Sequence, residues 1–159
     1  MDLRPGYGAF VHTPTESEAD QLLAVRALLE TESARLAAEN ASDEQIGLLR
    51  DLVSAGYTAT QRADIDVVVQ ANADFHRTVT EASGNRVLAE LAAQVDRRVR
   101  WYYAPVAHVR GAASWDEHAA LVDVIENRDA DAALRLMNEH TERTRRTYHE
   151  QVDGADSDS

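Results

Sequence analysis

Residues 70–85, "QANADFHRTVTEASGN", predict a helix whose buried face carries two polar side chains. Asn72 and His76 are four residues apart, so on a helix they lie one turn apart on the same face. The other members of that face are apolar: Ile65, Val68, Val69, Phe75 and Val79. Asp74 projects about 200° away from Asn72 and is expected to face solvent. The helix therefore directs an amide and an imidazole into the core.

Two further predicted helices each place one histidine, His118 and His140, on an apolar face. Their neighbours on these faces are Trp115, Leu121, Val122 and Ile125 in one helix, and Ala133, Leu136, Met137 and Thr144 in the other. Burying imidazoles without partners costs free energy, so three inward histidines indicate one shared partner. A divalent transition metal bound by neutral imidazoles is one such partner. A buried hydrogen-bond network is the alternative.

Helical periodicity on both sides of this stretch predicts an all-α fold, an antiparallel bundle of about six helices. The expected helices span about residues 16–40, 42–56, 63–83, 86–103, 114–127 and 129–152. Ser42 with Gln45, and Ser114 with Glu117, form capping-box patterns at two helix starts. Pro105 is expected to end the fourth helix because proline lacks the amide hydrogen.

The two ends of the chain do not follow this pattern. Residues 1–13 contain "LRPGYGAFV", an extended-strand composition too short to form a domain. Residues 153–159, "DGADSDS", are small and acidic and are predicted to be disordered. We therefore expect one helical domain over residues 14–152.

Composition excludes several classes of function. The 159 residues include 28 Asp and Glu against 16 Lys and Arg, a formal net charge of -12, which disfavours a surface for nucleic acid or anionic membranes. The chain has no cysteine, so disulfides, zinc–thiolate sites and thiol nucleophiles are excluded. No signal-peptide pattern or membrane-spanning run occurs, and a cytoplasmic protein is expected.

Three segments resemble successive signatures of the FCD domain of FadR-type GntR transcription regulators. They are "VRALLETESARLAAE", "NADFHRTVTEASGNRVLAEL" and "WDEHAALVDVIENRDADAALRLMNEH". The resemblance covers residues 16–150 and implies an effector-binding and dimerisation domain, functioning as a homodimer. Residues 3–11 are similar to the last wing strand of the family's winged helix-turn-helix domain. The resemblance thus implies that DNA binding needs that domain, and this chain alone is expected not to bind specific DNA.

The resemblance also implies a set of site residues. The metal ligands of metal-binding members correspond here to Asn72, His76, His118 and His140, the set that helical periodicity selects. Zinc is the first expectation, with nickel, cobalt or iron as alternatives. Many members have aspartate at the position of Asn72, and Arg128 stands where glycine is common.

A small carboxylate is the expected effector, because the uncharged ligand Asn72 leaves the metal's charge uncompensated. Arg26 is the first candidate to bind this carboxylate, since a guanidinium can hold it in bidentate fashion. A pairing of Arg26 with Glu30, one turn on, is the alternative. Arg98, on the face of Leu91 and Val95, is the second candidate.

Two other functions were weighed against a sensory domain. Three histidines and open metal positions also suit a metal-dependent hydrolase or lyase that acts on a small organic acid. Such an enzyme needs a general base, and no Asp or Glu is expected to face inward, because Glu117 and Glu139 are predicted to project sideways. A purely structural dimerisation domain would leave the histidines unexplained.

Overall fold

The computed structural model describes the backbone of residues 2–4 and 8–10, and both backbone and side chains of residues 16–157, with the Trp101 side chain excepted. Its helices are α1 (Glu16–Asn40), α2 (Asp43–Gln61), α3 (Ile65–Ala82), α4 (Arg86–Glu126) and α5 (Ala130–Ser157). Helix α4 is kinked at Gly111, so the bundle has six helical segments, as predicted. Two short strands, β1 (Asp2–Arg4) and β2 (Gly8–Phe10), pair antiparallel with Leu3 opposite Ala9.

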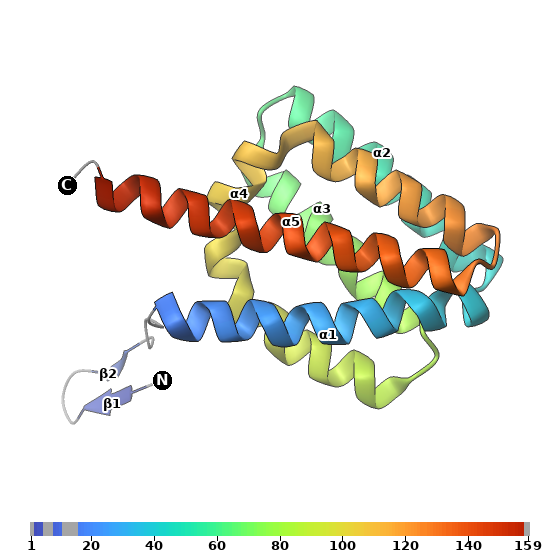
Figure 1. Ribbon diagram of the computed structural model, residues 1–159, viewed down its shortest axis with the longest axis horizontal. Helices are drawn as coiled ribbons and strands as arrows, with labels where there is room; N and C mark the ends of the chain where they lie inside the picture. Colours follow the sequence, from blue (N-terminus) through green and yellow to red (C-terminus); the bar gives the residue numbers. More distant parts are fainter. Residues whose placement is uncertain (1, 5–7, 11–15, 158–159) are drawn as a thin grey trace.

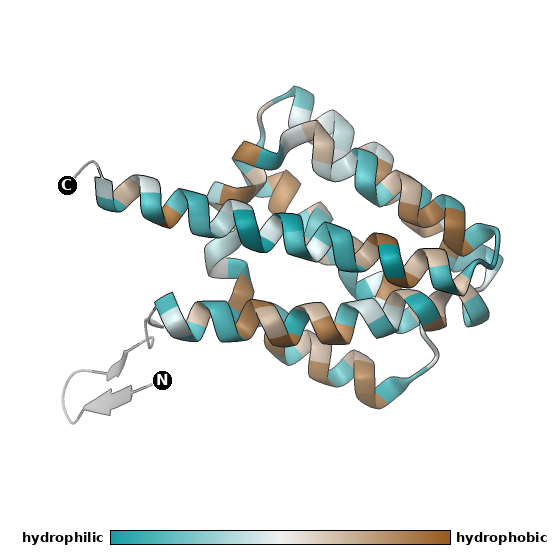
Figure 2. Ribbon diagram, viewed as in Figure 1, coloured by the Kyte–Doolittle hydropathy of each residue, from teal (hydrophilic) through white to brown (hydrophobic). Residues whose placement is uncertain are grey.

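The helices form a bundle in which α1 and α5 lie side by side along its length (Figure 1). Helix α4 contacts all the other helices, and α3 packs between α1, α2 and α4. Figure 2 shows a largely hydrophilic visible face on α5, as expected for a helix on the outside of a bundle. No described helix is long and apolar enough to cross a membrane.

Several helix ends follow the sequence signals. The Ser42 hydroxyl accepts a hydrogen bond from the Gln45 amide, and the Gln45 side chain accepts one from the Ser42 amide, completing the capping box. Gly84 ends α3 with a φ of 74°, a conformation that favours glycine. Asp129 caps α5 through the Ala132 amide. Arg128 has a φ of 59°, which gives a physical reason for the glycine common at this position.

Two predicted boundaries were wrong in the region of α4. Pro105 lies inside α4, and the helix continues to a break at Gly111, where φ is 47° and ψ is -134°. Tyr103, Val106 and Ala107, close to Pro105, are buried, so their packing offsets the one backbone hydrogen bond that proline removes. Ser114 and Glu117 do not form a capping box: Ser114 bonds to Tyr103, and Glu117 turns to Arg110 and His140.

The remaining differences lie at helix ends and at the N-terminus. Helix α2 continues past Gly56 to Gln61, and α5 continues through the acidic tail to Ser157, so described residues 153–157 are helical rather than disordered. Residues 158 and 159 lie outside the described part of the chain. Residues 2–4 and 8–10 form two paired antiparallel strands, where the sequence suggested a single wing strand.

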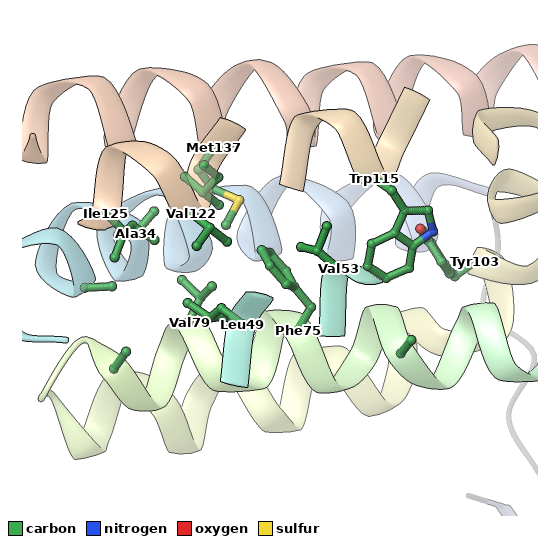
Figure 3. Close-up of a cluster of buried hydrophobic side chains, with 14 of the residues drawn as sticks. Ala34, Leu49, Val53, Phe75, Val79, Tyr103, Trp115, Val122, Ile125 and Met137 are labelled. Atoms are coloured by element: carbon green, nitrogen blue, oxygen red, sulfur yellow. The ribbon is translucent and has the colours of Figure 1, made fainter. Parts of the chain in front are cut away.

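The hydrophobic core runs along the bundle axis (Figure 3). It extends from Ile125 at one end, past Phe75, to Trp115 and Tyr103 at the other end. Phe75 and Trp115 are almost fully buried, and both contact His118. The core aromatics therefore form one wall of the region that holds the histidines.

Gly56→Ala is expected to destabilise the protein by about 1–3 kcal/mol, because overpacking strains a filled core. A Cβ atom at this position would lie 2.2 Å from the Trp115 ring, which is itself buried. Gly47→Ala, in the same helix, is the control: no atom lies within 4 Å of the added methyl group. It should stabilise by up to about 1 kcal/mol. Urea unfolding of both variants measures the effects, and equal stabilities would contradict the packing argument.

Candidate metal centre

His76 from α3, His118 from α4 and His140 from α5 converge in the bundle interior. One ring nitrogen from each lies within 4.8 Å of the others. The Nε2 atoms of His118 and His140 are 3.2 Å apart. All three side chains are at most 5% exposed. The helical pattern predicted that these residues face inward, and the structure brings them together.

The aromatic core holds the His118 ring in place. Phe75 stacks on it at a centroid distance of 4.1 Å, and Trp115 meets it edge-on at 4.8 Å. Since packing fixes the ring plane, the position of its nitrogens is fixed too. This arrangement is suited to a ligand site, in which donor atoms must be held in place before the ligand binds.

Burial keeps the imidazoles of His118 and His140 neutral. It holds the pKa of His118 well below the usual 6.5, and the nearby His140 and His76 lower it further. Burial also lowers the pKa of His140 to about 4, although a hydrogen bond to Glu117 opposes this shift. The uncharged form is the one that offers a nitrogen lone pair to a metal.

Asn72 lies one turn before His76 in α3 and is 3% exposed. Its Oδ1 atom is buried without a hydrogen-bond partner among the described residues, as are Nε2 of His76 and Nδ1 of His118. Buried polar atoms in native proteins nearly always have partners. These unpartnered atoms fit a bound cation, which would accept a lone pair from the amide oxygen and from His76.

Glu30 of α1 contacts His76 at its Nδ1 atom. The sequence had not indicated that Glu30 belongs to the site. Its Oε2 lies 2.8 Å from Nδ1 of His76, and its Oε1 lies 3.3 Å from Nε of Arg26. Burial disfavours the charged form of Glu30, but Arg26, followed by His76, outweighs this and lowers its pKa to about 2. Glu30 is thus an ionised, buried carboxylate that positions a histidine.

Glu117 holds His140 in the same way. Its Oε1 is 2.7 Å from Nδ1 of His140, and it also pairs with Arg110 and Arg143. Burial opposes ionisation of Glu117, but hydrogen bonds from His140 and Arg110 outweigh it and lower its pKa. The expectation that Glu117 projects sideways was wrong, because its carboxylate contacts Arg110 on the other side of the break at Gly111 and His140 of α5.

A proton on Nδ1 that faces a carboxylate leaves Nε2 as the nitrogen with a free lone pair. This holds for His140, which is hydrogen-bonded to Glu117, whereas Nδ1 of His76 lies close to Glu30 without hydrogen-bond geometry. Glu139, by contrast, lies outside the cluster as predicted, paired with Arg135 and Arg143.

The two candidate effector arginines differ in position. Arg26 is buried, but it pairs with Glu30 and lies 3.9 Å from Asp96, so the alternative pairing is the one observed. Its positive charge already has two carboxylate neighbours. Arg98 is exposed and pairs with Glu18 at 2.6 Å, away from the histidines. The structure therefore gives Arg98 no contact with the site.

A cavity of about 260 Å³ opens between α3 and the first half of α4, beside His76 and Glu30. Its other lining residues are Ala73, Arg77, Thr80, Ala92, Ala93, Asp96, Arg97 and Arg100. A second, much smaller cavity next to it is bordered by Arg26 and Asn72. The sequence pattern missed Arg97 and Arg100 because they follow no apolar stripe.

Comparison with known proteins finds relatives among transcriptional repressors. The HTH-type transcriptional repressor NanR of Citrobacter rodentium is 30% identical over 132 residues, which are 79% of this chain and 49% of that protein. NanR of Escherichia coli K12 is 29% identical over 133 residues, 79% and 48% of the two chains. The chain thus spans about half the length of these curated relatives.

Solved structures share the fold. Escherichia coli McbR/YncC aligns with a TM-score of 0.79 at 18% identity, over 94% of this chain and 73% of that one. Streptococcus agalactiae GntR aligns with a TM-score of 0.73 at 21% identity, over 91% and 73%. The FCD domain family matches residues 21–143. The chain therefore belongs to the FCD domain family, the effector-binding regulatory domains of GntR-type transcription regulators.

Proposed function

We propose that this domain senses a small organic acid at a divalent-metal centre formed by Asn72, His76, His118 and His140. The observation that carries the proposal is the convergence of three buried imidazoles from three helices. Zinc is our first choice of metal, and nickel, cobalt or iron also suit three imidazoles and an amide. The bound ion would supply positive charge and open coordination positions for a carboxylate.

The protein's own residues would prepare this centre. Glu30 and Glu117 orient His76 and His140 by facing their Nδ1 atoms. Because both carboxylates lie outside the set of donor nitrogens, they hold the rings and need not bind the ion themselves. The four ligands carry no formal charge, so the effector's negative charge would not compete with an anionic ligand.

Catalysis is the weaker reading of the same centre. A general base works best with a pKa near the operating pH. The pKa of Glu30 is lowered to about 2 and that of Glu117 is lowered as well, so both remain ionised and poorly basic. The NanR relatives are named as repressors, which also favours a regulator over an enzyme.

The regulator would also need a second copy of this domain and a DNA-binding domain. We propose a homodimer, and DNA binding through a winged helix-turn-helix domain in a longer, cytoplasmic protein, since the relatives are about twice as long as this chain. Effector binding in this domain would then change how two such domains are placed on DNA.

Calorimetric titration of zinc-loaded protein with acetate, lactate and succinate tests the proposal. At least one acid should bind, and removal of the metal by a chelator should weaken its binding at least about tenfold, because the acid loses its main charge partner. Equal affinity in loaded and stripped protein would contradict the proposal. Turnover of an acid would instead favour the enzyme.

Asn72→Asp sharpens this test, because it adds one negative charge among the ligands. It should tighten metal binding and weaken acid binding, two opposite effects from one substitution. Asn138→Asp is the control, since it makes the same change on the exposed face of α5. An equal response of the two variants would indicate a general charge effect and count against the centre.

A further inference from the structure

The cavity beside His76 has two chemically different ends. At the inner end lie His76 and Glu30, both nearly fully buried. At the outer end lie three arginines, Arg77, Arg97 and Arg100, with side chains reaching solvent. Small residues, including Ala73 and Ala92, make the space between them. α3 and the first half of α4, which supply these residues, pack against each other (Figure 1).

The three arginines differ in their ion pairs. Arg77 lies 3.0 Å from Asp74, and Arg100 lies 3.5 Å from Asp96. Arg97 has no ion pair within residues 16–157, the part of the chain whose side chains the structure describes. The two carboxylates of the lining already have other partners, because Glu30 and Asp96 lie next to Arg26 and Asp96 also faces Arg100. Arg97 is therefore the lining arginine that has no described carboxylate partner.

We propose that this domain selects dicarboxylates, with one carboxylate at the histidine end and the second held by Arg97, assisted by Arg100. This rests on the proposed function for the inner end and adds the class of effector. A guanidinium binds a carboxylate through parallel N–H donors, so an unpaired arginine at a cavity mouth recognises an acid group specifically. Arg26 does not have this role, because Glu30 and Asp96 already neutralise it.

The size of the cavity limits the ligand. A volume of about 260 Å³ is slightly below the range of roughly 300–1,000 Å³ that holds drug-sized ligands. An unbranched acid therefore fits, and its length must bridge the two ends. The volume leaves no room for a long acyl chain.

The test is a calorimetric comparison of dicarboxylates with monocarboxylates of the same chain length on the zinc-loaded protein. The probes are malonate, succinate, glutarate and adipate, against propionate, butyrate, valerate and hexanoate. The best dicarboxylate should bind roughly five- to tenfold more tightly than its matched monocarboxylate. Arg97→Gln should remove this preference and leave the monocarboxylate affinity unchanged. Arg98→Gln, next along the chain but paired with Glu18, should keep the preference.

Each outcome separates the two proposals. If monocarboxylates bind as tightly as dicarboxylates, or if Arg97→Gln keeps the preference, selection by Arg97 is wrong, while metal-dependent binding still supports the sensor. If no acid binds to the loaded protein, both proposals fail. Because Arg97 is exposed, its variant should unfold at the wild-type temperature, and a thermal scan checks this.

Discussion

His118→Ala is expected to abolish nearly all binding of divalent metal, of which the purified protein should carry about one ion per chain. His118 is fully buried between Phe75 and Trp115, so water cannot easily replace the lost imidazole as a ligand. His76→Ala and His140→Ala should have the same effect, because each removes one of three donor nitrogens. Elemental analysis of the purified variants measures the metal content.

Thermal unfolding gives a second measurement, since an ion that joins three helices stabilises the folded state alone. At a free metal concentration 100 times the Kd, the stabilisation is about 2.7 kcal/mol, or roughly 5–10 °C for a domain of this size. A chelator should therefore lower the unfolding temperature of the wild type and leave the three variants unchanged. Because each variant is compared with itself in the presence and absence of chelator, the destabilisation from the cavity that each alanine creates does not affect the result.

His108→Ala is the matched control, because His108 is exposed on α4 and outside the cluster. It should keep both the metal and the response to chelator. Wild-type metal content in all three cluster variants would show that the histidines form a hydrogen-bond network instead.

Glu30→Gln should destabilise the protein by about 3 kcal/mol, because it removes the charge that neutralises buried Arg26. That loss corresponds to roughly 6–12 °C in the unfolding temperature. Asp96, at 3.9 Å from Arg26, is too distant to compensate fully. The variant should also weaken metal binding by about 10–100-fold, since His76 loses its orienting carboxylate.

Two variants control this experiment. Glu32→Gln, on the same helix, breaks a more exposed pair with Arg35 and should cost less than about 1 kcal/mol. Combining Arg26→Leu with Glu30→Leu should recover most of the stability, because an apolar pair leaves no buried charge. If Glu30→Gln and Glu32→Gln unfold alike, the buried pair contributes little to the fold.

The acid response of Glu30 has a defined sign. Its pKa falls from 4.5 to about 2 on folding, so its contribution is complete above pH 4.5 and is lost as the pH falls toward 2. The buried His140 acts in the same direction at higher pH. Its pKa falls from 6.5 to about 4 on folding, so as the pH is lowered the unfolded chain takes up this proton first. The free energy of unfolding therefore decreases as the pH falls from 6.5 to about 4.

Helix positions were predictable wherever a local signal sets them. α1 has the predicted bounds, and Ser42 and Gly84 cap their helices as expected, because these contacts involve residues a few positions apart. The predicted helix end at Pro105 was wrong, since the lost hydrogen bond is a local cost whereas the burial of its neighbours is a tertiary gain. The real break, Gly111, carries no stronger local signal than Gly56, which stays helical.

The sequence by itself determined which face of α3, of the second half of α4 and of α5 is buried, and hence that Asn72, His76, His118 and His140 point inward. A period of 3.6 residues assigns a side chain to a face without knowledge of any other helix. Tertiary structure alone decided what lies opposite that face. Glu30 meets His76 across 46 positions in the chain, and Glu117 meets His140 across 23, because contacts between helices depend on their rotation and crossing. The same packing pairs Arg98 with Glu18 and leaves Arg97 at the cavity mouth, although the two residues are adjacent in sequence.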